Sequence, residues 1–119
     1  MADQLTDALE IFVATCSHVR STRDLITKVR VELEEGYVLD LYFREATGQY
    51  SYTLLQNEQR VIGWDNARHY PDLPNAPHHF HKEDDEVESS GLVGKPAEDI
   101  RIVAKHINAL YAKIKNDAG

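Results

Sequence analysis

Apolar residues recur every three or four positions near both ends of the chain, as they do on one face of an amphipathic helix. The first of these stretches covers about residues 3–18, and the second begins after Gly94, with Pro96 in its first turn. Proline suits that position because the first helical turn does not need its missing N–H. We therefore expect one helix at each end. The apolar positions are Leu5, Ala8, Leu9, Phe12, Val13 and Cys16 in the first helix, and Ile100, Val103, Ala104, Ile107, Leu110 and Ile114 in the second.

Between the two helices the apolar period changes to two, which is typical of strands with one buried face. It predicts four strands, over residues 25–34, 37–43, 50–55 and 60–65. Ser21, Thr22 and Asp24 indicate a turn before the first of them. The connections around Gly36 and Gly48 are short. Because parallel strands need long crossovers, consecutive strands are expected to be antiparallel.

These elements predict an α+β fold in two layers, with the order α-β-β-β-β-α. A four-stranded antiparallel meander would carry both terminal helices on one face. The other face would be polar, either as a binding surface or simply as a solvated one. A length of 119 residues fits a single domain, 1–119. The residues expected on the polar face include Lys28, Arg30, Asp40, Tyr42 and Ser51.

Composition favours a cytoplasmic protein. The hydrophobic fraction of 42% is enough for a core, yet no apolar run reaches the roughly 20 residues that span a membrane. The N-terminus has no pattern of a secretory signal. Cys16 is the single cysteine, which excludes an internal disulfide, and its place on an apolar helix face predicts a buried thiol.

The net charge of −7 is unevenly distributed. Five acidic residues between positions 83 and 88 contribute −5 of it, so the rest of the chain carries −2. A local basic patch therefore remains compatible with the sequence, and the charge does not exclude RNA as a partner. The acidic run is typical of a solvated loop, although it could instead cover a site. The candidates for a basic patch are Arg20, Arg23, Lys28, Arg30, Arg60 and Arg68.

Periodicity stops after Asn66 and returns only near residue 95. A loop of about thirty residues in a compact domain is usually functional or disordered. This one begins after Trp64, which is expected to anchor it to the core. Its prolines recur every third residue and should stiffen an extended course. They are Pro71, Pro74 and Pro77, and the same stretch holds four of the six histidines, His69, His78, His79 and His81.

Three kinds of chemistry are compatible with this stretch. Histidines could act as general acids and bases at a phosphodiester, with Asp65 or Asp72 orienting an imidazole and Arg68 or Arg60 contacting phosphate. Alternatively, His79 and His81, two apart on an extended segment, project to one side and with His69 and a carboxylate could bind zinc or a similar divalent ion. In the third case the histidines only satisfy backbone groups. The spacing matches no strong zinc signature and no cysteine supports a metal site, so a divalent metal such as zinc is compatible with the sequence but is not the favoured interpretation.

The stretch closely resembles a motif of the TumE-like family of toxins from toxin–antitoxin loci. The chain departs from the family pattern at Arg68, where proline is expected, and at Tyr70, where a second histidine is expected. The resemblance implies a toxin component of a type II system in bacteria or archaea, with a protein antitoxin as its partner. The matching residues are Trp64, Asp65, Asn66, Ala67, His69, Pro71, Asp72, Leu73, Pro74, Asn75, Pro77, His78, His79 and His81.

The leading hypothesis from the sequence is a prokaryotic toxin that cleaves RNA with its loop histidines, without contact to a membrane. The alternative is a non-enzymatic module for protein interaction or for binding of a metal through histidines. The oligomeric state, including a homodimer, is left open. In the leading hypothesis the catalytic residues are His69, His78, His79 and His81, the orienting carboxylates are Asp65 and Asp72, and Arg68 contacts phosphate.

Overall fold

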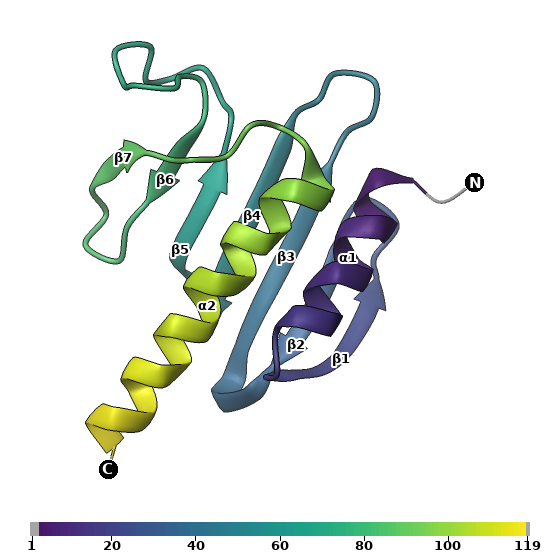
Figure 1. Ribbon diagram of the computed structural model, residues 1–119, viewed down its shortest axis with the longest axis vertical. Coiled ribbons are helices and arrows are strands. Elements are labelled where there is room, and N and C mark those ends of the chain that lie inside the picture. Colours follow the sequence, from purple (N-terminus) through teal and green to yellow (C-terminus); the bar gives the residue numbers. More distant parts are fainter. Residues whose placement is uncertain (1–2, 119) are drawn as a thin grey trace.

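The computed structural model describes residues 3–118 and has two layers, a seven-stranded sheet and a pair of helices (Figure 1). The strands form an antiparallel meander in which each pairs with its neighbours in the chain. The elements are α1 (Gln4–Thr15), β1 (Val19–Asp24), β2 (Val29–Leu33), β3 (Tyr37–Phe43), β4 (Tyr50–Gln56), β5 (Gln59–Asp65), β6 (His79–His81), β7 (Val87–Ser89) and α2 (Pro96–Ala118), with a short 3-10 turn (Glu34–Gly36) between β2 and β3.

The α+β class and the two terminal helices are confirmed, but the prediction of four strands is wrong. The predicted strands correspond to β2, β3, β4 and β5, and the sheet adds β1 at one edge and β6 and β7 at the other. The predicted turn at residues 21–24 lies within β1, and the chain turns instead at Ile26, whose φ is 72°. β1 is exposed along nearly its whole length, so it has no alternating apolar face to reveal it.

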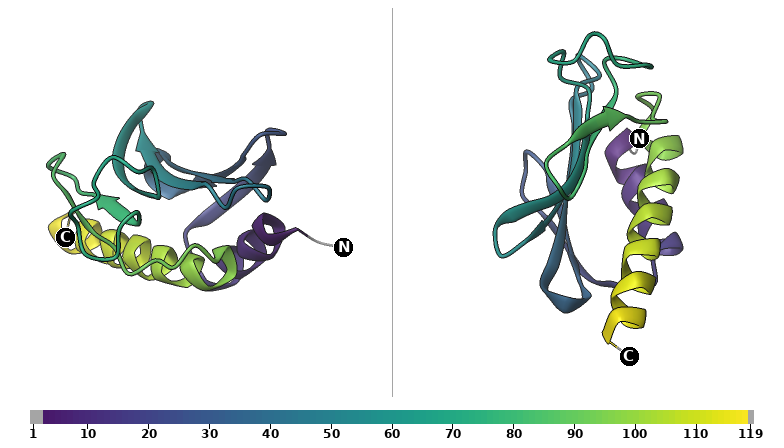
Figure 2. Two further views of the ribbon diagram at one scale, coloured as in Figure 1. Left: turned by 90° about the horizontal axis from the view of Figure 1, so that it is seen from above. Right: turned by 90° about the vertical axis from the view of Figure 1, so that its left-hand side faces the viewer.

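Both helices pack on the same face of the sheet, as predicted (Figure 2). The core between the two layers is built from the inward residues of the strands and the apolar stripes of the helices, except that Val13, predicted for the first stripe, is 45% exposed. Cys16 lies in this core with 3% of its surface exposed, which confirms the buried thiol, and burial raises its pKa. The fully buried members include Ala8, Phe12, Val31, Leu39, Leu41, Tyr52, Leu54, Ile100, Val103 and Ile107.

Helix α2 is tied to the preceding loop through the carboxylate of Asp99. That carboxylate accepts hydrogen bonds from the backbone N–H groups of Val93, at 2.9 Å, and Gly94, at 2.8 Å. Asp99 lies in the first turn of the helix, where a negative charge complements the helix dipole. Over residues 3–118, neither helix combines the length and the apolar character needed to cross a bilayer.

The sheet face away from the helices, here called the open face, is polar as predicted. At its centre Asp40 of β3 accepts hydrogen bonds from Lys28 Nζ and Arg30 Nε, each at 2.8 Å. Asp40 is 7% exposed, and burial alone would raise its pKa. The hydrogen bonds and charges of Arg30 and Lys28 together outweigh burial, so the pKa of Asp40 is lowered.

Replacement of Asp40 should make the protein less stable in a pH-dependent way. A lowered folded-state pKa means that the carboxylate stabilises the fold above its unfolded pKa, about 3.9, and that this contribution is lost as the pH falls through the folded-state value. We expect Asp40→Asn to cost about 2 kcal/mol at pH 7. The difference from the wild type should shrink towards pH 3 in urea denaturation followed by circular dichroism. Asp72→Asn, at an exposed carboxylate, is the control, and a difference that does not vary with pH would contradict the argument.

Candidate functional site

The pairing of β5 with β6 brings the conspicuous polar residues together. Asp65 lies opposite His79 in the antiparallel register, and Gly63 lies opposite His81. Because side chains alternate along a strand, Asp65, His79 and His81 project from the open face. The prediction that His79 and His81 point to the same side is therefore confirmed.

Asp65 connects the two imidazoles. Its Oδ1 lies 2.9 Å from His79 Nε2, and its Oδ2 lies 3.0 Å from His81 Nε2. The backbone N–H of Ala67 also donates to Oδ1, at 2.9 Å. On its other side the ring of His79 contacts the carbonyl of Pro77, with Nδ1 at 2.9 Å. We call Asp65, His79 and His81 the Asp65 cluster; one carboxylate forms a hydrogen bond with His81 and a close contact with His79.

The Asp65 cluster forms part of a pocket of about 290 Å³ on the open face. His79 is only 1% exposed, whereas the side chain of His81 is 12% exposed and is the more accessible of the two. Tyr70 lies over both rings, with its ring centre 4.8 Å from that of His79 and 6.3 Å from that of His81. Tyr70, one of the two positions at which the sequence departs from the family pattern, thus lines this pocket. The other lining residues are Gln49, Tyr50, Ser51, Arg60, Ala67 and His69.

Arg60 supplies the positive charge of this pocket. The register of β4 and β5 skips Val61, so that Arg60 pairs with Leu55 and turns to the open face. Its side chain passes over Gly63, where a Cβ would lie 3.4 Å from Arg60 Cδ. Burial lowers the pKa of His81 and the charge of Arg60 lowers it further, against the opposing effect of Asp65. Arg60 was only the alternative to Arg68 in the sequence analysis, because uninterrupted alternation would turn it inward with Ile62.

The four loop histidines do not all converge. His69 lines the rim of the pocket, while His78, next to His79 in the chain, points away from it. His78 Nδ1 lies 2.9 Å from the hydroxyl of Tyr50, and the two rings stack with their centres 5.8 Å apart. Asp72 is exposed and does not line the pocket. The structure therefore brings His79, His81 and Asp65 together with His69 at the rim, and it does not bring in His78 or Asp72.

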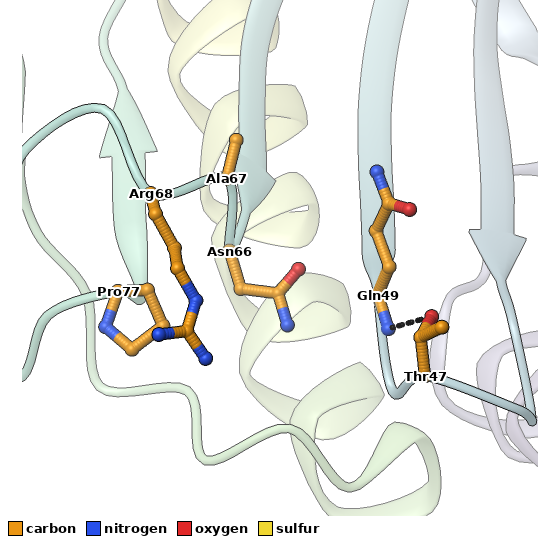
Figure 3. Close-up of a pocket in the computed structure, with 6 residues that line it drawn as sticks. All are labelled: Thr47, Gln49, Asn66, Ala67, Arg68 and Pro77. Carbon is orange, nitrogen blue, oxygen red and sulfur yellow. Dashed lines mark hydrogen bonds between the residues drawn. The ribbon is translucent and has the colours of Figure 1, made fainter.

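Arg68 lies in a second pocket of about 460 Å³ beside the first. Figure 3 shows its side chain extending between Asn66 and Pro77. Gln49 and Ala67 line both pockets, so the two hollows adjoin on the same end of the sheet. Arg60 therefore lies in the pocket of the Asp65 cluster, and Arg68 lies in the adjoining pocket.

Side chains of the motif also hold the loop in place. Trp64 is 3% exposed and packs on Phe80 with a ring separation of 4.9 Å, which confirms it as an anchor. Asn66 accepts a hydrogen bond from the backbone N–H of Tyr50 at 3.0 Å. Asn75 donates to two backbone carbonyls between β7 and α2, at 2.8 and 2.9 Å. These contacts fix both ends of the segment that carries Arg68, His69 and Tyr70.

The acidic run does not cover the Asp65 cluster. It forms the turn between β6 and β7 and, with Ile62, Phe80 and His106, lines a hollow on the helix side of the sheet. Its lysine neighbour, Lys82, lies 3.9 Å from Glu88. The negative charge is therefore separated by the sheet from the pocket that holds Arg60.

Nearly the whole chain, and not only the motif, is similar to one protein family. A family model described as Toxin TumE matches residues 3–116, which include every element of the sheet and nearly all of α2. Comparisons with curated proteins and with solved structures gave no match.

Proposed function

Because the chain belongs to the TumE toxin family, we propose that it is the toxin of a toxin–antitoxin pair and that it cleaves RNA at the Asp65 cluster. The family supports the role of a toxin, and a protein antitoxin would be its partner. The single observation that carries the location is the shared carboxylate of Asp65, which holds two imidazoles beside a pocket that contains an arginine. Groups of this kind are needed where a phosphodiester is attacked.

In RNA cleavage the 2′-oxygen attacks phosphorus and the bond from phosphorus to the 5′-oxygen breaks. The step requires a group that accepts the proton of the attacking oxygen and returns one to the leaving oxygen, and a positive charge for the phosphate. The Asp65 cluster would supply the first, and Arg60, on the wall of the same pocket, would supply the second. Arg68 would contact a neighbouring phosphate from the adjoining pocket. Two arginines at adjoining pockets suit a polymer with a phosphate at each nucleotide better than a single small ester.

The accessible and the buried histidine would have different roles. His81 and the rim residues His69 and Tyr70 face the pocket and would touch the substrate. His79 is almost fully buried between Asp65 and the carbonyl of Pro77, so it would position the carboxylate rather than meet the RNA. The proposal leaves His78 and Asp72 outside the reacting group.

The proposal is tested by incubating the purified protein with labelled single-stranded RNA. We expect His81→Ala to lose at least about 100-fold in initial cleavage rate, the usual contribution of a group that takes part in proton transfer. His78→Ala is the matched control from the same segment: it removes the hydrogen bond to Tyr50 but no group of the pocket, and its rate should stay within about threefold of the wild type.

Two results would contradict the proposal. One is equal loss of activity in His78→Ala and His81→Ala while both variants keep the wild-type circular dichroism spectrum. The other is intact RNA, both in the assay and in cells, when expression of the wild-type protein stops growth; the toxin would then act on a different target.

A further inference from the structure

We infer that the Asp65 cluster binds one divalent transition-metal ion of the zinc class, through the carboxylate of Asp65 and the Nε2 atoms of His79 and His81. The three ligand atoms all lie within 4.8 Å of one another. The inference deepens the proposed function and rests on it for the role of the site. With the ion bound, Asp65, His79 and His81 are its ligands, and a water on the open position of the ion replaces the imidazole as the group that gives up and accepts protons. Ion binding can be measured without RNA.

The hydrogen bonds of His79 favour an ion. Its Nδ1 faces the carbonyl oxygen of Pro77, which can only accept, so the proton of a neutral ring is on Nδ1. Nε2 then presents a lone pair to Asp65 Oδ1 at 2.9 Å. That oxygen already accepts the N–H of Ala67. Two facing acceptors at this distance need either a shared proton or a metal ion between them.

A metal ion would satisfy the whole cluster at once. Asp65 is shared between the two rings, because its Oδ2 also lies 3.0 Å from His81 Nε2. A bound ion uses the lone pairs of both rings and of the carboxylate at the same time.

The surroundings match what metal-binding side chains require. A histidine that binds a metal through one ring nitrogen usually donates the other N–H to a carbonyl or carboxylate, as His79 does to Pro77. Two imidazole nitrogens and one carboxylate oxygen form a set that zinc and its neighbours accept. Three protein ligands leave a coordination position open, as in catalytic sites, and here it would face the pocket beside Arg60.

Binding of an ion would change the distances in both directions, because ligand atoms that are up to 4.8 Å apart would have to approach one another. A tetrahedral ion with ligands at about 2.1 Å separates ligand atoms by about 3.4 Å. The two contacts of Asp65, at 2.9 and 3.0 Å, would lengthen slightly when an ion entered. The ligand set differs from the one considered from the sequence, because Asp65 supplies the carboxylate and His69 lies at the rim of the pocket instead.

The test is a titration of the protein, freed of any affinity tag and stripped with a chelator, with Zn²⁺ by calorimetry and with Co²⁺ by visible absorption. We expect one equivalent per chain and cobalt bands typical of a nitrogen–oxygen site. His81→Ala should weaken binding by at least about 100-fold, more than the loss of an outer-shell partner does. His69→Ala and His78→Ala should bind as the wild type does, which separates this ligand set from other histidines. If His81→Ala loses its circular dichroism spectrum, His81→Asn takes its place.

Absence of stoichiometric binding to the wild type overturns the inference, and so does equal weakening in His78→Ala and His81→Ala. Failure of the ion site and failure of the proposed RNA cleavage give different results. If RNA cleavage continues in the presence of a chelator, with no ion bound, the inference of a metal site is overturned and the proposed function stands. If the protein binds one equivalent of Zn²⁺ but leaves RNA intact, the metal site is supported and the proposed cleavage of RNA is overturned.

Discussion

Asp65→Asn should abolish cleavage, with a loss of roughly 1,000-fold or more in the rate on labelled RNA and loss of growth arrest in cells. The reason is that a single carboxylate holds both imidazoles through its two oxygens. An asparagine keeps the size of the side chain but replaces one acceptor oxygen by an N–H donor and removes the negative charge. The negative charge beside both rings is therefore lost, and a metal ion loses its charged ligand.

Asp72→Asn is the matched control for this experiment. It makes the same chemical change at an exposed carboxylate of the same loop, outside the pocket, and should leave the rate within about twofold. Thermal denaturation of both variants would show whether Asp65→Asn is folded at the assay temperature. If folded Asp65→Asn kept about a tenth of the wild-type rate, the cluster would not be the reacting centre.

Phe12→Ala should have the largest effect on stability, lowering the free energy of unfolding by about 3–5 kcal/mol. Phe12 is fully buried on the face of α1 that packs against the rest of the core. Its removal leaves a cavity between the layers. Domains of this size have about 5–15 kcal/mol of stability in total, so the loss is a substantial part of it.

The measurement is urea denaturation followed by circular dichroism. Val13→Ala is the control, because Val13 is the next residue on the same helix and is 45% exposed. It should change the free energy of unfolding by no more than about 0.5 kcal/mol. A loss below about 1 kcal/mol in Phe12→Ala would mean that the packing of α1 on the sheet contributes little to stability.

The central part of the fold could be predicted because its elements are long and buried on one side. Strands β2 to β5 and both helices each repeat their apolar period several times, and that repetition identifies them. Strands β6 and β7 have three residues each, and β6 directs a single apolar residue, Phe80, towards the core. A period cannot be recognised from one residue, so these strands were included in the loop.

The site was only partly accessible from the sequence for a similar reason. Spacing placed His79 and His81 on one side, and the same alternation would have separated His78 from them. The partnership with Asp65 depends on the register of β5 and β6, which the sequence does not indicate. The orientation of Arg60 depends on the unpaired Val61, a local irregularity that reverses the expected face.

The position of the histidines on a three-residue strand has a consequence for how the protein could be switched off. The cluster joins two strands, since Asp65 belongs to β5 and its histidines to β6. It exists only while that short pairing is closed, and short pairings near the edge of a sheet open far more often than the whole molecule unfolds. Under the proposed function, this local equilibrium sets the fraction of reactive molecules, and amide hydrogen exchange at residues 79–81 measures it. A partner that captured β6 in its open form would inactivate the toxin while leaving the core between α1, α2 and β3 intact.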